Sequence, residues 1–347
     1  MRLGYNINML RGAEDLAVLE QVTEAERLGY RVVWAAEAYG SDAATPLAWL
    51  AGRTSTIELG SAVFQIPARS PAMTAMTAAT LDLLSGGRFR LGLGVSGPQV
   101  SEGWHGVRFD HPLARTREYV QVVRAALARE RVAYQGEHVR LPLPDGPGKA
   151  LRLALHPART RIPLYLAAIG PRNLELAGEL ADGWLAIFFA PEHAPGWLAA
   201  VRAGRERAGS TLEGFDVVAN APVVIGPDVA ACADAVRPFA ALYVGGMGSR
   251  RRNFYNDLAA GMGFEPEARL VQERYLAGDR AGAEAALPLA FIDQVALLGP
   301  VERVAERLQA YAEAGVTTLN LAAGGPPQVR LALLRGLVAA AERAGVG

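Results

Sequence analysis

The segment Arg88-Phe-Arg-Leu-Gly-Leu-Gly-Val-Ser-Gly-Pro-Gln-Val-Ser-Glu-Gly-Trp-His-Gly106 combines a predicted buried strand with a polar loop. Apolar residues at positions 89, 91, 93 and 95 alternate with Arg90 and two glycines, which is the period of a strand. The strand breaks at Ser96-Gly97-Pro98, and we expect a loop with no helix before about Pro112. Because glycine lets a backbone approach a ligand closely, this loop is a predicted binding segment.

The same segment contains Gly92-Leu-Gly-Val-Ser-Gly97, which matches the G-x-G-x-x-G pattern of dinucleotide-binding folds. That pattern requires a strand-to-helix turn, which places the pyrophosphate at the N-terminus of a helix. Here the first glycines lie inside the predicted strand and Pro98 follows at once. We therefore interpret the match as a coincidence. A glycine-rich loop that binds no ligand is the alternative.

Composition excludes several classes of protein. The 347 residues carry a formal net charge of zero, with 51% hydrophobic and 20% charged residues, which indicates a globular protein with a large core. Zero net charge argues against nucleic acid or a membrane surface as the main partner. The N-terminal residues Met1–Asn8 are typical of a strand and not of a signal peptide, so we expect a cytoplasmic protein. Cys232 stands alone and the five histidines show no ligand spacing, so no metal site is predicted.

Apolar strands alternate with helices along the whole chain. The predicted strands cover residues 2–8, 31–37, 57–64, 88–95, 163–169, 183–188, 216–225 and 317–321. Their uniformly apolar character predicts a parallel sheet that is buried on both faces. Eight βα units predict an α/β fold of the (β/α)8 TIM-barrel class, forming one domain over residues 1–347, with insertions after strand 4 and before strand 8. An open doubly wound sheet is the alternative.

The active site of a TIM barrel lies at the C-terminal ends of its strands. This rule selects Glu37 after the second strand and the strand ends at residues 61–65, 95–105, 169–173, 188–189 and 322–325. Gly170-Pro171 opens a predicted helix, where proline suits the first turn and the following N–H groups are free to bind an anion, with Arg172 adding positive charge. A solvated helix start without a ligand is the alternative. The second insertion, with Gly245–Gly248 and Arg250–Arg252, is positioned to fold over the barrel mouth.

The whole chain resembles the bacterial luciferase-like superfamily, and within it the coenzyme F420-dependent (deazaflavin) oxidoreductase branch. The resemblance rests on the order and spacing of the segments Val33–Glu37, Leu59–Val63, Gly94–Trp104, Ile169–Ala177, Gly245–Gly248 and Gly299–Pro300. It implies that a deazaflavin ring binds at the barrel mouth, backed by a cis peptide bond at Ala62–Val63. It also implies the cofactor-binding residues Ser61, Ala62, Val63, Ser96, Gly97, Pro98, Ser101, Ala168, Ile169, Gly170, Pro171, Arg172 and Asn173.

Two acidic residues are the predicted catalysts, Glu37 and Glu102. In related deazaflavin enzymes an acid lies at the end of the second strand, where Glu37 stands in this chain. Burial disfavours the charged form of a carboxyl group, so such a residue suits proton transfer. The alternative for Glu37 is a carboxylate that caps a loop or pairs with an arginine. Ala38 replaces the histidine that follows this acid in luciferases, which weighs against peroxyflavin chemistry.

The resemblance therefore implies an oxidoreductase that transfers a hydride between F420 and a small organic substrate. Two other functions stay open: an FMN-dependent luciferase-like monooxygenase, and a flavin- or deazaflavin-binding protein without turnover. The family further implies a homodimer. Neither the substrate nor the direction of hydride transfer follows from the sequence.

Overall fold

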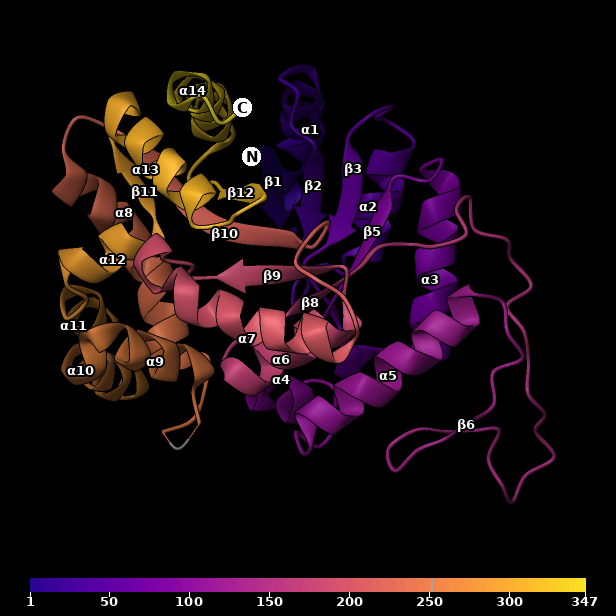
Figure 1. Cartoon of the computed structure of the whole chain (residues 1–347). Helices are drawn as coiled ribbons and strands as arrows, with labels where there is room; N and C mark the ends of the chain where they lie inside the picture. Colours follow the sequence, from indigo (N-terminus) through magenta and orange to yellow (C-terminus); the bar gives the residue numbers. More distant parts are fainter. Residues whose placement is uncertain (251) are drawn as a thin grey trace.

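Eight parallel strands close into a barrel in the described part of the chain (Figure 1). The computed structural model describes residues 1–250 and 252–347. The barrel strands are β1 (Arg2–Asn8), β2 (Val32–Ala35), β3 (Glu58–Ser61), β5 (Phe89–Gly94), β8 (Leu164–Ala167), β9 (Gly183–Ile187), β10 (Asp216–Ile225) and β12 (Thr318–Ala322). They pair in the order β1-β2-β3-β5-β8-β9-β10-β12, and β12 pairs with β1 to close the ring. The predicted TIM barrel is confirmed, and the open sheet is excluded.

Helices surround the barrel (Figure 1). They are α1 (Val18–Arg27), α2 (Ala44–Ala51), α3 (Pro71–Leu84), α4 (Pro98–Gly103), α5 (Pro112–Leu127), α6 (Pro171–Leu180), α7 (Ala194–Arg207), α8 (Val229–Ala241), α9 (Phe254–Ala259), α10 (Glu265–Leu276), α11 (Arg280–Ala285), α12 (Leu289–Val295), α13 (Val301–Glu313) and α14 (Pro327–Ala344). Shorter helical turns are the 3-10 turns η1 (Ala13–Ala17), η2 (Ile66–Ala68) and η3 (Pro191–His193), and the π-helical turns η4 (Leu242–Gly246) and η5 (Ala260–Phe264). No helix among the described residues is long and apolar enough to cross a membrane.

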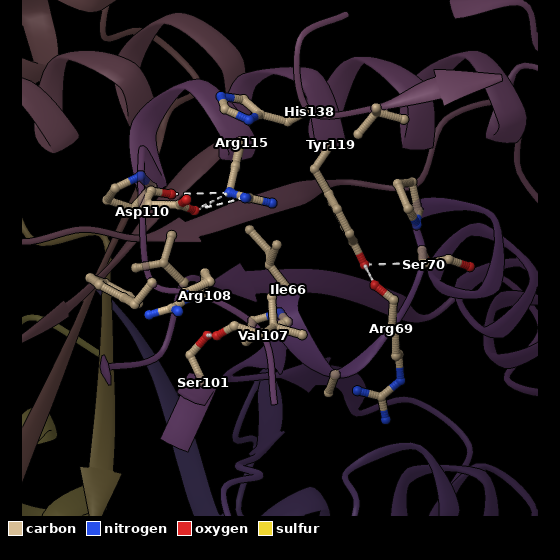
Figure 2. A pocket seen from close by; sticks show the side chains of 17 residues that line it. Ile66, Arg69, Ser70, Ser101, Val107, Arg108, Asp110, Arg115, Tyr119 and His138 are labelled. Atoms are coloured by element: carbon tan, nitrogen blue, oxygen red, sulfur yellow. Dashed lines mark hydrogen bonds and ion pairs between the residues drawn. The ribbon is translucent and has the colours of Figure 1, made fainter. Parts of the chain in front are cut away.

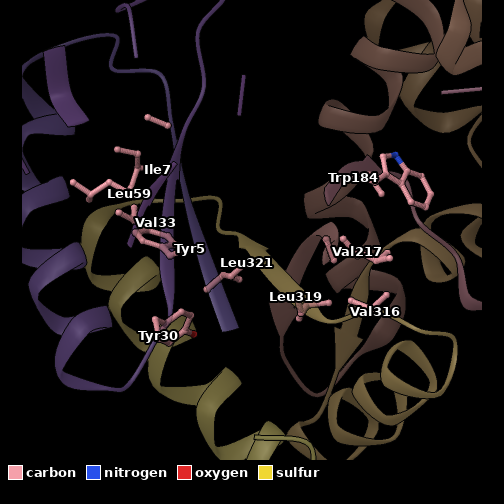
Figure 3. Packing of buried hydrophobic residues seen from close by; sticks show 14 of the residues in the cluster. Tyr5, Ile7, Tyr30, Val33, Leu59, Trp184, Val217, Val316, Leu319 and Leu321 are labelled. Atoms are coloured by element: carbon pink, nitrogen blue, oxygen red, sulfur yellow. The ribbon is translucent and has the colours of Figure 1, made fainter. Parts of the chain in front are cut away.

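The strands bury both faces because their side chains alternate between two cores. In β2, Val33 points to the layer between barrel and helices, where it joins residues such as Tyr5, Leu59 and Leu321 (Figure 3). Trp34 belongs to the separate cluster with Tyr165, and the two rings meet edge to face at 5.2 Å. The predicted near-continuous apolar strands follow from this double burial.

Two glycines of β5 lie where the barrel strands approach most closely. A Cβ on Gly92 would come within 1.9 Å of the backbone oxygen of Ser61, and one on Gly94 within 2.6 Å of Val63. These glycines thus serve packing between strands, which agrees with interpreting the G-x-G-x-x-G match as a coincidence.

The expectation of a helix-free loop after β5 is wrong. Helix α4 begins directly after Gly97, with Pro98 in its first turn. Proline is favoured at that position because its fixed φ suits a helix and its missing N–H has no intrahelical partner there. The helix spans only six residues, which is too short for an apolar period to be recognised in the sequence.

Two segments depart from the regular alternation. Between α5 and β8, the two-stranded antiparallel pair β6 (Tyr134–Gln135) and β7 (Arg140–Leu141) lies on an arm that extends away from the barrel (Figure 1). Between α8 and β12 lies a group of helices in which α10 packs against α9 and α11, and α11 and α12 pack against α8. Two short strands extend the sheet: β4 (Phe64–Gln65), after β3, pairs with β5, and β11 (Leu297–Gly299) pairs with β10. The sequence had not predicted β4, β11 or α12. Arg251, in the basic run named above, lies outside the described residues.

Candidate active site

The C-terminal ends of the barrel strands carry three non-glycine residues with positive φ. They are Asn8 (φ 56°) at the end of β1, Ser96 (φ 61°) after β5 and Phe188 (φ 51°) after β9. Such left-handed residues cost free energy and gather at functional sites. The peptide bond between Ala62 and Val63, after β3, is cis. The cis bond implied by the resemblance is therefore confirmed.

Two helix starts face this mouth from neighbouring strands. β5 pairs with β8, and α4 and α6 follow them, each opened by a Gly-Pro pair. No side chain caps either start. Gly170 has φ 79° and open space where a Cβ would stand. The longer helix, α6, therefore presents backbone N–H groups that suit an anion such as a phosphate, and the exposed Arg172 lies beside them.

The other predicted cofactor residues have mostly structural contacts. The buried Ser61 hydroxyl donates to Gly92 O at 2.8 Å and accepts from Gly92 N at 2.9 Å. Ser101 donates to Val107 O at 2.7 Å, and Ala168 O accepts from the Trp184 indole at 3.0 Å. These groups hold neighbouring strands and loops together, and their contact with a cofactor stays a prediction.

The side chain of Glu37 is buried, and both of its carboxylate oxygens accept hydrogen bonds. Its carboxylate pairs with both terminal nitrogens of Arg69, one of them at 2.8 Å. It also accepts from Ala43 N and Gln65 N, each at 3.0 Å. These four donors favour the alternative stated for this residue, a carboxylate that caps a loop and pairs with an arginine. Its role as acid or base stays a prediction.

Glu102 is exposed, and its carboxylate accepts from Phe109 N at 3.0 Å. This bond closes the loop after α4. Trp104 is 66% exposed, which disfavours it as a wall for a bound ring. Catalysis by Glu102 stays a prediction as well.

Sequence reasoning missed a hydrogen-bonded chain beside Glu37. The Gln65 side chain donates to Glu37 O at 2.9 Å, and its oxygen lies 2.8 Å from His105 Nε2. Arg69 also lies over the Phe64 ring, with 4.5 Å from its guanidinium carbon to the ring centre. The sequence signal was the presence of Gln65 and Arg69 in the segment directly after the third strand.

A cavity of about 330 Å³ lies beside this network (Figure 2). η2, the loop of residues 107–112, α5 and the β6–β7 pair line it. Arg69, Arg108 and Arg115 line it. Arg69 pairs with Glu37, and Arg115 pairs with Asp110 at 2.7 Å. Among the predicted cofactor residues, Ser101 lines this cavity.

A second cavity, of about 600 Å³, opens at the mouth itself. Its lining comes from the loops after β1 and β2 and from η4, and includes Met9, Leu10, Tyr39 and Leu242. The segment after α8 thus reaches the mouth. On the side of β5, Met247 O would lie 3.6 Å from a Cβ on Gly97, which also places that segment over the strand ends.

Known proteins resemble the chain over nearly its whole length. A family model for luciferase-like monooxygenases matches residues 11–318. A candidate coenzyme F420-dependent oxidoreductase of Mycobacterium tuberculosis is 43% identical over 337 residues, which cover 95% of this chain and 97% of that protein. The 5,10-methylenetetrahydromethanopterin reductase of Archaeoglobus fulgidus is 30% identical over 306 residues and 87% of each chain.

Structural comparison agrees with these matches. The coenzyme F420 dependent tetrahydromethanopterin reductase of Methanopyrus kandleri superposes with a TM-score of 0.81 at 24% identity, over 96% of this chain and 97% of that chain. The two proteins share the closed barrel fold. Sequence, strand order and mouth geometry together lead to one conclusion: the chain belongs to the luciferase-like monooxygenase family.

Proposed function

We propose that the protein is an oxidoreductase that transfers a hydride between coenzyme F420 and a small organic substrate. The observation that carries this proposal is the uncapped start of α6 at Gly170-Pro171, beside Ser96-Gly97 at the mouth. It provides free N–H donors for an anionic cofactor tail in a chain whose 43%-identical relative is named for coenzyme F420. The reductase of A. fulgidus adds a second oxidoreductase among the relatives.

The residues of this chain fit the proposed cofactor. Arg172 and the N–H groups of the first turn of α6 would hold its phosphate, and the Ala62–Val63 bend would support its ring. When bound, the deazaflavin supplies the carbon that donates or accepts the hydride. The protein contributes binding, orientation and a place for the substrate at the mouth cavity. The whole chain acts as one domain in the cytoplasm.

Equilibrium titration with F420 and with FMN, side by side, tests this function. We expect the protein to bind F420 more tightly than FMN. Arg172→Glu should weaken F420 binding by about 10-fold or more, because it places a negative charge beside the phosphate site. Arg202→Glu, on the exposed surface of α7, is the matched control and should leave the affinity unchanged.

Tight FMN binding with negligible F420 binding would favour the monooxygenase and overturn this function. Tight F420 binding without turnover of any substrate would favour a binding protein.

A homodimer is the proposed assembly, formed through α3. This helix exposes Met73, Met76, Leu83 and Leu84 by 48% to 56% each, and their spacing places them along one side. A second copy of the chain would cover this apolar stripe. Light scattering should give the mass of a dimer for the wild type and of a monomer for Met76→Glu, while Val329→Glu, an exposed apolar position on α14, stays dimeric. A monomeric wild type would contradict the assembly.

A further inference from the structure

Three asparagine side chains form a chain of hydrogen bonds across neighbouring barrel strands. Asn6 of β1 and Asn320 of β12 both donate through Nδ2 to Asn220 Oδ1 of β10, at 2.9 Å and 3.0 Å. Asn6 and Asn320 are buried. At one end of the chain, Asn8 N donates to Asn6 Oδ1 at 2.8 Å, and Asn8 is the left-handed residue at the end of β1. The chain therefore joins β10, β12 and β1 and reaches the barrel mouth.

These hydrogen bonds fix the orientation of the last amide in the chain. A backbone N–H can only donate, so the Asn6 atom that accepts from Asn8 N is the side-chain oxygen, and Asn6 presents its NH2 group to Asn220. Asn220 then presents its oxygen, and this oxygen requires the NH2 group of Asn320. The other atom of the Asn320 amide, Oδ1, is an acceptor. It is buried and has no hydrogen-bond partner within the described residues.

The indole N–H of Trp34 borders the same space as this acceptor. Trp34 Nε1 is buried and, like Asn320 Oδ1, has no hydrogen-bond partner in the described part of the chain. A Cβ on Gly4 would lie 3.1 Å from Asn320 Oδ1 and 3.5 Å from Trp34 Nε1, so both atoms lie next to the space that this glycine leaves. Gly60 packs against the indole ring, where a Cβ would come within 2.2 Å, and this contact holds the ring in its orientation. A donor and an acceptor without protein partners thus lie beside one glycine inside the barrel.

We propose that a water molecule is bound inside the barrel beside Gly4, where it accepts a hydrogen bond from Trp34 Nε1 and donates one to Asn320 Oδ1. A water molecule both accepts and donates, which is what these two groups together require. An anion would meet the acceptor Oδ1, and a metal cation would meet the indole N–H, so neither charged ligand satisfies both groups. Internal water is typically held by buried polar groups that lack protein partners, whereas apolar cavities stay dry. The ligand of this site is therefore a single small neutral molecule.

The bound water connects two parts of the barrel mouth. Ala62 and Val63, which follow β3, pack against the cluster that contains Trp34. With the water in place, hydrogen bonds run without a gap from the Trp34 indole through the three asparagine side chains to Asn8 N. The water thereby fixes the amide of Asn320, on which the orientation of the other two amides depends. Displacing it should loosen the hydrogen bond of Asn8 N at the far end.

A nuclear Overhauser effect between water and the Trp34 indole proton tests this site in the wild-type protein. The measurement needs no cofactor, so its outcome is independent of the proposed function. The chain has five tryptophans, and their indole resonances are few enough to assign individually. We expect a water cross-peak at the Trp34 indole proton. The control is the Trp184 indole, which is also buried but donates to Ala168 O at 3.0 Å and should show none. A missing cross-peak at Trp34, or equal cross-peaks at both indoles, would overturn the proposal.

Gly4→Ala tests the position of the water, because it puts a methyl group into the space beside both polar atoms. We expect this variant to lose the water cross-peak at Trp34 and to exchange its Asn8 amide hydrogen about 10-fold faster than the wild type. Gly196→Ala, where a Cβ would meet nothing within 4 Å, should change neither quantity.

Two outcomes in these variants would contradict the proposal. A folded Gly4→Ala protein that keeps the water cross-peak would show that the water does not lie beside this glycine. Unchanged hydrogen exchange at Asn8, with the cross-peak lost, would contradict the connection to the mouth. If Gly4→Ala does not fold, the wild-type spectrum decides, because its comparison of Trp34 with Trp184 depends on no variant.

Discussion

Arg69→Met is expected to lower the free energy of unfolding by about 3 kcal/mol or more. The Glu37 side chain is 6% exposed and Arg69 14%, so removing the guanidinium leaves a buried carboxylate without its counter-ion. Methionine keeps apolar contact with Phe64, over which the arginine lies. Urea unfolding followed by tryptophan fluorescence measures the change. Arg117→Met is the control, because its pair with Glu179 is more exposed, at 38% and 20%, and should cost about 1 kcal/mol at most.

The double variant Arg69→Met with Glu37→Gln separates the two interpretations of Glu37. If the carboxylate is structural, removing its charge as well should recover part of the lost stability, because the amide no longer needs the counter-ion. The recovery is incomplete because the amide NH2 then faces one of the two backbone N–H groups, of Ala43 or Gln65, that the carboxylate oxygens accept from. Glu37→Gln alone should then change F420-dependent turnover little. If Arg69→Met were as stable as the control Arg117→Met, the structural role of the Glu37 carboxylate would be contradicted. If Glu37→Gln abolished turnover while the protein kept its normal stability, Glu37 would be the acid or base.

Gly92→Ala is expected to destabilise the barrel by about 3 kcal/mol. The new Cβ would stand 1.9 Å from Ser61 O and 2.8 Å from Leu185, and neither the backbone of β3 nor the barrel interior has room to move away. The shift would also break the two hydrogen bonds of the Ser61 hydroxyl to Gly92. The variant should therefore unfold at a lower urea concentration and bind F420 more weakly.

Gly196→Ala is the matched control for that substitution. It stands in α7, where a Cβ would meet nothing within 4 Å, so the change should be neutral or slightly stabilising. Equal stability of Gly92→Ala and Gly196→Ala would contradict the packing role given to Gly92.

The start of α6 at the barrel mouth was visible in the sequence because its signal is local. Gly170-Pro171 marks a helix start wherever the helix lies, and the barrel rule puts the residues after each strand at the mouth. The contacts of Glu37 were not visible, because its partner Arg69 stands 32 residues away and only the fold brings them together. The family resemblance and the expected burial of Glu37 suggested a proton-transfer residue, and the four donors around its carboxylate suggest a structural role.

The sequence by itself determined the eight-stranded barrel, the strand ends that form its mouth and the start of α6 that faces it. Each depends on short-range periodicity and on the backbone preferences of glycine and proline, which act within a few residues. The tertiary structure alone decided that β5 continues directly into α4, that the backbone of Gly92 lies against Ser61 of β3, and that Arg69 pairs with Glu37. The first could not be predicted because helix α4 is too short to show an apolar period. The other two could not be predicted because they depend on close approach between segments far apart in the chain.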